Sequence, residues 1–196
     1  MHLARPISAF VLLLACCSFA YTQRPGPEFW RKVSCEPLEP RTMLEALEGK
    51  YTTIVLKGFT RISTVEVKGI RVDAIEMHEL GSNARVKGVV IVLRETGGRV
   101  EDNRAFIDYD ELDPLLSVID TLSRLDETST KLAGFEGRYR TKGDLEIQVF
   151  RQTRAGNAVV LQTGICELAT TSLSLDELAK VKALLQEAKA RLDEIK

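Results

Sequence analysis

Apolar and polar residues alternate at a period of two through much of the segment 51–108, which is the pattern of half-buried β-strands. Val65, Val67 and Gly69 fall on one face of a predicted strand. The run 89–93 is continuously apolar, which is typical of a strand covered on both faces. Glycines within 96–99 predict a hairpin before a returning strand at 104–107. These signals together predict an antiparallel sheet.

Apolar spacing and capping signals predict three helices. Thr42 and Glu45 have the spacing of a capping box, ahead of a short helix that ends at Gly49. A second helix carries one apolar stripe, made of Leu112, Leu115, Leu116, Ile119 and Leu122. A third helix covers 175–195 and presents a narrow a/d seam of Leu178, Val181, Leu185, Ala188, Leu192 and Ile195.

The second half of the chain repeats the order of the first. Strands are predicted at 135–141, 145–151, 158–163 and about 167–173, and the long helix follows them. Asp108 lines up with Ser174 ahead of the two main helices, and Gly69 lines up with Gly143. We therefore predict an α+β fold of two antiparallel β-sheets from an internal β-β-β-β-α repeat, each copy followed by an amphipathic helix. Copy one covers about 51–126 and copy two about 134–196, within a single domain at 42–196.

The first 20 residues have the features of an export signal. Arg5 provides a basic start, 7–15 is almost uninterruptedly apolar, and small residues stand at Ser18 and Ala20 before a cleavage point. An alternative is a lipobox ending at Cys16, which would then carry a lipid anchor. Residues 21–41 hold four of the six prolines and predict an extended tether. The expected location is secreted or periplasmic, or lipid-anchored at the membrane through Cys16.

Composition narrows the function classes. The 196 residues carry 27 basic and 28 acidic side chains, with 44% hydrophobic residues, as ordinary globular domains do. This balance excludes a strongly basic nucleic-acid arm as the main feature. Signal cleavage would leave Cys35 and Cys166, which are either a disulfide pair in an oxidising compartment or two free thiols.

Catalytic motifs are missing from the sequence. His78 is the one histidine left after processing, and we expect it to face solvent on a strand. The acidic residues Asp108, Asp110, Glu111 and Asp113 are best explained as helix caps, with Asp108 and Glu111 as a capping box and Asp113 ahead of Pro114. Ser174 and Glu177 form the same capping box in the second copy. We predict no catalytic residues, no metal site and no cofactor, and hence no enzyme.

One predicted sheet face has binding character. Arg138, Arg140 and Lys142 alternate along one strand, Phe150 points to the same side from the next strand, and Arg151 follows it. Cations beside an aromatic ring on an open sheet suit single-stranded nucleic acid, in which bases stack and phosphates pair with the cations. A solvated face or a protein interface explains the same residues more simply.

Coactivator-type single-stranded-DNA-binding proteins contain a strand-strand-helix unit. The run 142–150, a hairpin and the segment 172–178 resemble that unit in the order of their elements. Two copies of four strands and a helix resemble the Whirly family. The resemblance implies that fold and single-stranded nucleic acid as ligand. The family's Lys-Gly-Lys-Ala-Ala-Leu motif is absent, so no functional residue carries over.

The export signal argues against a nucleic-acid partner. We therefore predict a non-catalytic extracytoplasmic binding or interaction module, with an unidentified protein or envelope component as partner. The alternative is a single-stranded nucleic-acid-binding protein of Whirly-like fold. A homodimer through the a/d seam of the long helix is a further alternative to packing of that helix on its own sheets.

Overall fold

The computed structural model describes residues 39–65, 68–94, 103–152, 156–164 and 169–195, which belong to one compact unit. Several predictions fall outside these residues. They are the signal peptide at 1–20, most of the tether at 21–41, the residues Cys16, Cys35 and Cys166, and the hairpin at 96–99.

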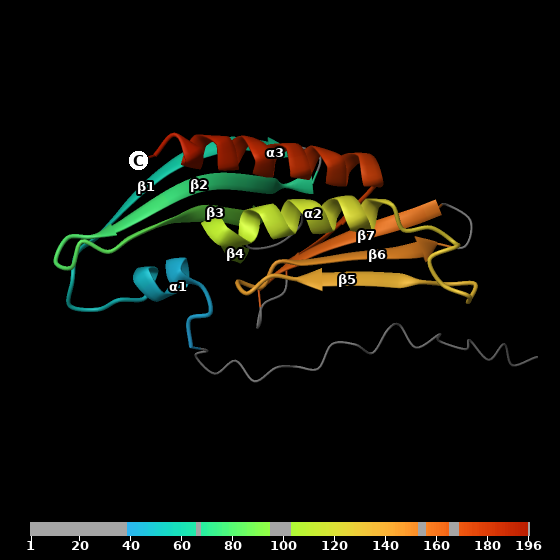
Figure 1. The fold of residues 1–196 in the computed structure, drawn as a ribbon, viewed down its shortest axis with the longest axis horizontal. Helices are drawn as coiled ribbons and strands as arrows, with labels where there is room; N and C mark the ends of the chain where they lie inside the picture. Colours follow the sequence, from blue (N-terminus) through green and yellow to red (C-terminus); the bar gives the residue numbers. More distant parts are fainter. Residues whose placement is uncertain (1–38, 66–67, 95–102, 153–155, 165–168, 196) are drawn as a thin grey trace, which may run out of the picture. The chain divides into compact units, whose positions relative to one another are not determined.

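Eight strands form two antiparallel sheets, each with its strands in chain order (Figure 1). The first sheet consists of β1 (Val55–Val65), β2 (Ile70–Glu79), β3 (Arg85–Leu93) and β4 (Asn103–Asp108). The second consists of β5 (Glu136–Arg140), β6 (Glu146–Gln152), β7 (Gly156–Thr163) and β8 (Ala169–Leu173). Helix α2 (Leu112–Ser123) follows the first sheet and α3 (Leu175–Asp193) follows the second. The predicted α+β class and the repeated sheet-and-helix order are confirmed.

Each of these two helices packs mainly on the sheet of the other copy. Helix α3 contacts β1, β2 and β3, whereas α2 contacts β5 and lies beside α3 (Figure 1). Gly137 of β5 permits this approach, because a Cβ there would lie 2.4 Å from Leu125 Cδ1 and 3.1 Å from Leu122 Cδ2. The exchange of helices places the inner faces of both sheets around one shared core.

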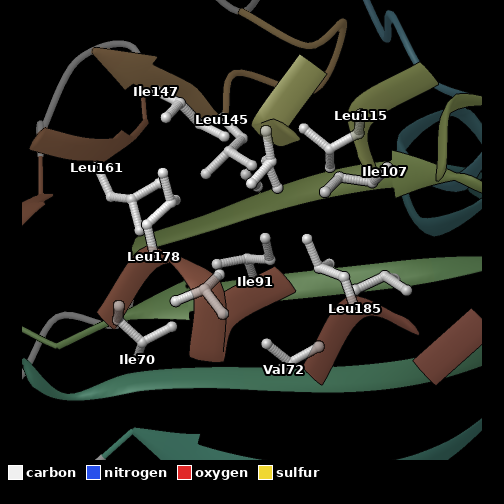
Figure 2. Close-up of a cluster of buried hydrophobic side chains, with 14 of the residues drawn as sticks. Ile70, Val72, Ile91, Ile107, Leu115, Leu145, Ile147, Leu161, Leu178 and Leu185 are labelled. Carbon is white, nitrogen blue, oxygen red and sulfur yellow. The ribbon is translucent and has the colours of Figure 1, made fainter. Parts of the chain in front are cut away.

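The shared core is aliphatic. Figure 2 shows Ile70, Val72 and Ile91 of the first sheet, Leu145, Ile147 and Leu161 of the second, Leu115 of α2, and Leu178 and Leu185 of α3. All of these side chains are at most 1% exposed. Complete burial of one such side chain contributes about 1.5–3 kcal/mol of transfer free energy, so this cluster dominates the stability of the fold.

The opposite face of the first sheet has a smaller core under helix α1 (Met43–Glu48). Leu44 and Leu47 of α1 pack there against Met77, Val92 and Phe106. The continuous apolar run at 89–93 is explained by this arrangement, because its alternate residues enter the two different cores. The prediction that this strand is covered on both faces is confirmed.

Asp108 fixes the start of α1. Its carboxylate accepts hydrogen bonds from the backbone N–H of Met43 at 2.7 Å and of Leu44 at 3.1 Å. The predicted capping box at Thr42 and Glu45 is confirmed, and Gly49 ends the helix. Asp108 therefore holds free N–H groups at the N-terminus of a helix that precedes it by more than 60 residues.

The capping box predicted at Asp108 and Glu111 is wrong. Asp108 makes no side-chain cap to the 3₁₀ turn that follows it, and the Glu111 carboxylate accepts from the backbone N–H of Lys142 at 3.2 Å. Asp113 is no cap either, because α2 already begins at Leu112. The corresponding box at Ser174 and Glu177 is present at the start of α3.

Two further contacts join the copies. Gly143, in the turn between β5 and β6, forms a bridge with Phe106 of β4. Lys87 of β3 donates from Nζ to the backbone oxygens of Leu192 at 2.8 Å and Ile195 at 3.2 Å, at the C-terminal end of α3. A cation at this end also favourably opposes the helix dipole.

The boundary between β1 and β2 differs from the prediction. β1 ends at Val65, and Gly69 lies in the turn before β2 with a φ of 65°. Gly69 is therefore not a strand residue on the same face as Val65, as the alternation predicted.

The cap on α1 can be tested by Asp108→Ala. Loss of both hydrogen bonds should lower the free energy of unfolding by about 1–2 kcal/mol, measured by urea denaturation. Hydrogen exchange of the amides at 43–47 should accelerate more than that of α3. Asp110→Ala is the matched control, since the Asp110 side chain is 77% exposed. Equal destabilisation by the two substitutions would contradict the assigned role.

Candidate functional site

The basic face predicted on the second sheet is partly assembled. The register pairs Glu136 with Phe150, Arg138 with Gln148 and Arg140 with Glu146, so Arg138, Arg140 and Phe150 share one face. Lys142 lies beyond the end of β5, in the turn before β6. Arg151 belongs to the opposite face of β6, since strand residues alternate between faces.

Each base of this predicted site has a carboxylate beside it. Arg138 contacts Glu136 at 2.9 Å and Glu146 at 3.5 Å, and Arg140 contacts Asp144 at 2.6 Å. Lys142 lies 4.0 Å from Asp110, and Arg151 lies 2.7 Å from Glu127. The hydrogen bond from Arg138, followed by one from Gln148, lowers the pKa of Glu136, which keeps that carboxylate charged. The acids largely cancel the positive charge of the face.

His78 lies in β2 and is partly buried, with its Nε2 buried and without a hydrogen-bond partner. The expectation that it faces solvent holds only in part, since the side chain is neither fully buried nor fully exposed between its register partners Leu56 and Arg85. No group of three or more His, Cys, Asp or Glu side chains suited to a metal ion occurs within the described ranges.

Large apolar side chains are exposed around the start of β1, a feature that the sequence pattern does not reveal. Seven large hydrophobic side chains are exposed in the described part of the chain, and five of them lie on β1 or the segments beside its first residue. They are Tyr51 at 89%, Ile54 at 64%, Leu56 at 52%, Phe59 at 68% and Leu80 at 49% exposure. We call these five residues the β1 patch.

The position of β1 explains this exposure. β1 is an edge strand, paired with β2 alone among the described strands (Figure 1). The Leu80 backbone N–H donates to the Ile54 carbonyl at 3.0 Å, which holds the turn after β2 against the start of β1. The apolar run at 54–56 resembles a buried strand in sequence. Only the strand order reveals that these residues lie at an edge.

A partly buried ion pair lies beside the start of β1. Lys50 Nζ lies 2.7 Å from Glu79 Oε2, and Ser82 donates its hydroxyl to the same oxygen. These contacts lower the pKa of Glu79, first through the Lys50 hydrogen bond and then through Ser82. The carboxylate therefore joins the segment after α1 to the turn after β2, on either side of Ile54 and Leu80.

Comparisons with known proteins give no functional assignment: no family model, curated protein or solved structure matches the chain. The likeness to the Whirly family stays a prediction. Among the helices that the structure describes, none is long and apolar enough to cross a membrane.

The charge pairing on the second sheet predicts weak or no binding of single-stranded nucleic acid. Fluorescence anisotropy with a labelled oligonucleotide at about 20 and about 200 mM salt should show no salt-dependent binding, because paired cations displace few counterions. Salt-dependent binding that is abolished by Phe150→Ala would instead support the nucleic-acid alternative.

The Lys50–Glu79 pair predicts a pH-dependent contribution to stability. Because the folded-state pKa of Glu79 is lowered, its contribution is complete above the ordinary glutamate pKa of about 4.3 and is lost as the pH falls through the folded-state value. The difference in unfolding free energy between the natural protein and Glu79→Gln should therefore shrink on acidification. Glu187→Gln, at an exposed position of α3, should show no such trend. A difference independent of pH would contradict the assignment.

Proposed function

We propose that the protein is a non-catalytic interaction module that acts outside the cytoplasm and binds a protein or envelope component through the β1 patch. The observation that carries this proposal is the gathering of Tyr51, Ile54, Leu56, Phe59 and Leu80 at one sheet edge. Exposed large apolar side chains gathered along an unpaired strand edge, here on both faces of the strand, are typical of an interaction site.

Burial of the exposed apolar side chains at this edge would favour binding of a partner. Burying apolar area yields about 25 cal/mol per Å², and aromatic residues such as Tyr51 and Phe59 provide large contact areas with few rotatable bonds. Phe59 is 68% exposed, so the folded chain itself gains little from its ring. An edge strand with exposed apolar side chains is also open to pairing with another chain.

The extracytoplasmic location rests on the sequence of 1–20, with its basic start, apolar run and small residues before the cleavage point. Single-stranded nucleic-acid binding through Arg138, Arg140, Lys142, Phe150 and Arg151 is the alternative function. The acids beside these bases make it the weaker proposal.

A photo-crosslinker tests the proposal directly. Benzoylphenylalanine in place of Phe59, introduced in the cells that make the protein, should capture one defined envelope component identified by mass spectrometry. The matched control is the same group in place of Leu132, which is 77% exposed between α2 and β5. This control position should give no specific adduct.

A second variant separates binding from folding. Phe59→Ser should leave the unfolding free energy within about 0.5 kcal/mol, because the ring is exposed, while it reduces capture by a crosslinker placed at Leu56. Equal adducts from positions 59 and 132, or none from position 59, would contradict the proposal.

A further inference from the structure

We propose that the β1 edge binds an extended peptide segment that adds to the first sheet as a further strand and carries acidic side chains on either side of an apolar one. This inference rests on the proposed function and specifies its partner. Three features of the described residues support it: an unpaired strand edge, an exposed ring, and a positively charged groove beside that ring.

The edge offers backbone groups for pairing. In an antiparallel edge strand, alternate residues direct their N–H and C=O groups away from the sheet. The register with β2 is regular from Val55 to Arg61 and shifts between Arg61 and Ser63. The residues 55–61 therefore form a regular template for an added strand, and the irregularity marks its end.

Gly58 lies in the middle of this template. A Cβ at this position would meet only the Glu76 carbonyl oxygen, at 3.9 Å, so the described structure does not itself require glycine there. Glycine in a strand often permits the close approach of another backbone. Gly58 leaves such room between Lys57 and Phe59.

A groove of about 310 Å³ adjoins the template on the face that carries α1. Its lining includes Lys57, Phe59 and Arg61 of β1, Arg71 and Asp73 of β2, and Arg104 of β4. Because strand side chains alternate, Lys57, Phe59 and Arg61 all point to this face. The side chains of an added strand would face them at a cross-strand distance of about 5 Å.

The groove has excess positive charge. Lys57 and Arg104 share one oxygen of Glu48, at 2.9 and 3.1 Å. Arg71 and Arg61 share the carboxylate of Asp73, at 3.0 and 3.7 Å. Within the described residues, Lys57, Arg61 and Arg104 thus outnumber the two acids that pair with them, and the exposed Lys57 and Arg61 lie on either side of Phe59 along β1. An acidic residue opposite each cation and an apolar residue opposite Phe59 would complement this row.

This chemistry favours a peptide over two other occupants. A nucleic acid would leave the backbone edge unpaired and would find few excess cations, whereas its affinity depends on many phosphate contacts. A second copy of β1 would bring more positive charge without adding acids. Its antiparallel pairing at Phe59 would place Lys57 opposite the partner's Arg61, which is unfavourable.

The test is a displayed library of random 12-residue peptides, selected against the full chain. The enriched peptides should share the pattern acidic, any, apolar, any, acidic, which reads the same in either strand direction. N-methylation of a selected peptide at one set of alternate residues should abolish binding, because those N–H groups donate to β1. Methylation of the other set should be tolerated.

Charge reversal locates the site. Lys57→Glu together with Arg61→Glu should weaken binding of the acidic peptide by about tenfold or more. The matched control is Lys131→Glu with Lys180→Glu, which changes two other exposed lysines by the same total charge and should leave binding unchanged. Circular dichroism confirms that each variant is folded.

The remaining outcomes overturn the inference. These are the absence of enriched peptides, enrichment without acids, and insensitivity to N-methylation. Displacement of the peptide by an oligonucleotide, or a dimer in sedimentation that Lys57→Glu with Arg61→Glu abolishes, would assign the edge to another occupant. If crosslinking at Phe59 succeeds while peptide selection fails, the interaction module stands and strand addition does not.

Discussion

The exchange of helices between the two copies is the constraint on which the rest of the structure depends. Helix α2 follows the first sheet but packs beside β5 of the second, and α3 follows the second sheet but covers the first. Helix α3 also contacts β7 and β8 of its own copy, so the inner faces of both sheets are buried together in one core. The contacts of Lys87 with the end of α3, and of Gly143 with Phe106, also join the two copies.

The exchange also determines which surfaces remain for binding. The shared core takes the inner faces of both sheets, and α1, held by Asp108, covers part of the outer face of the first. β1 lies at the edge of the first sheet, and its Leu56 and Phe59 stay exposed although their neighbours in sequence resemble core residues. The two cores thus take up sheet faces, and the edge of β1 is the surface to which the binding proposals refer.

Local patterns in the sequence predicted the features that depend on interactions between residues close together in the chain. The continuous apolar run at 89–93, the stripe at Leu115 and Ile119, and the capping boxes at Thr42 and Ser174 all depend on residues within a few positions of one another. The predicted cap at Asp108 failed because the groups that this carboxylate binds are distant in sequence. Its spacing to Glu111 suits a local cap, but the N–H groups of α1 are closer in space.

The candidate site was the part least accessible to sequence reasoning. The basic residues Arg138 and Arg140 were placed correctly on one face with Phe150, but their pairing with Glu136 and Asp144 depends on three-dimensional neighbours. The partial burial of His78 depends on β1 and β3 beside it, an order of strands that local patterns do not specify. The same missing strand order concealed the β1 patch, whose residues become a surface only because β1 lies at an edge.

Residue-resolved amide hydrogen exchange of the full chain tests the central claim most directly, namely that one shared core leaves the edge of β1 open. The account predicts that the slowest amides of β2, β3, β6, β7 and α3 exchange together in one cooperative unit, while every second amide at 55–61 exchanges rapidly. Two sheets that exchange with separate free energies, or uniform protection along β1 in the isolated protein, would contradict it.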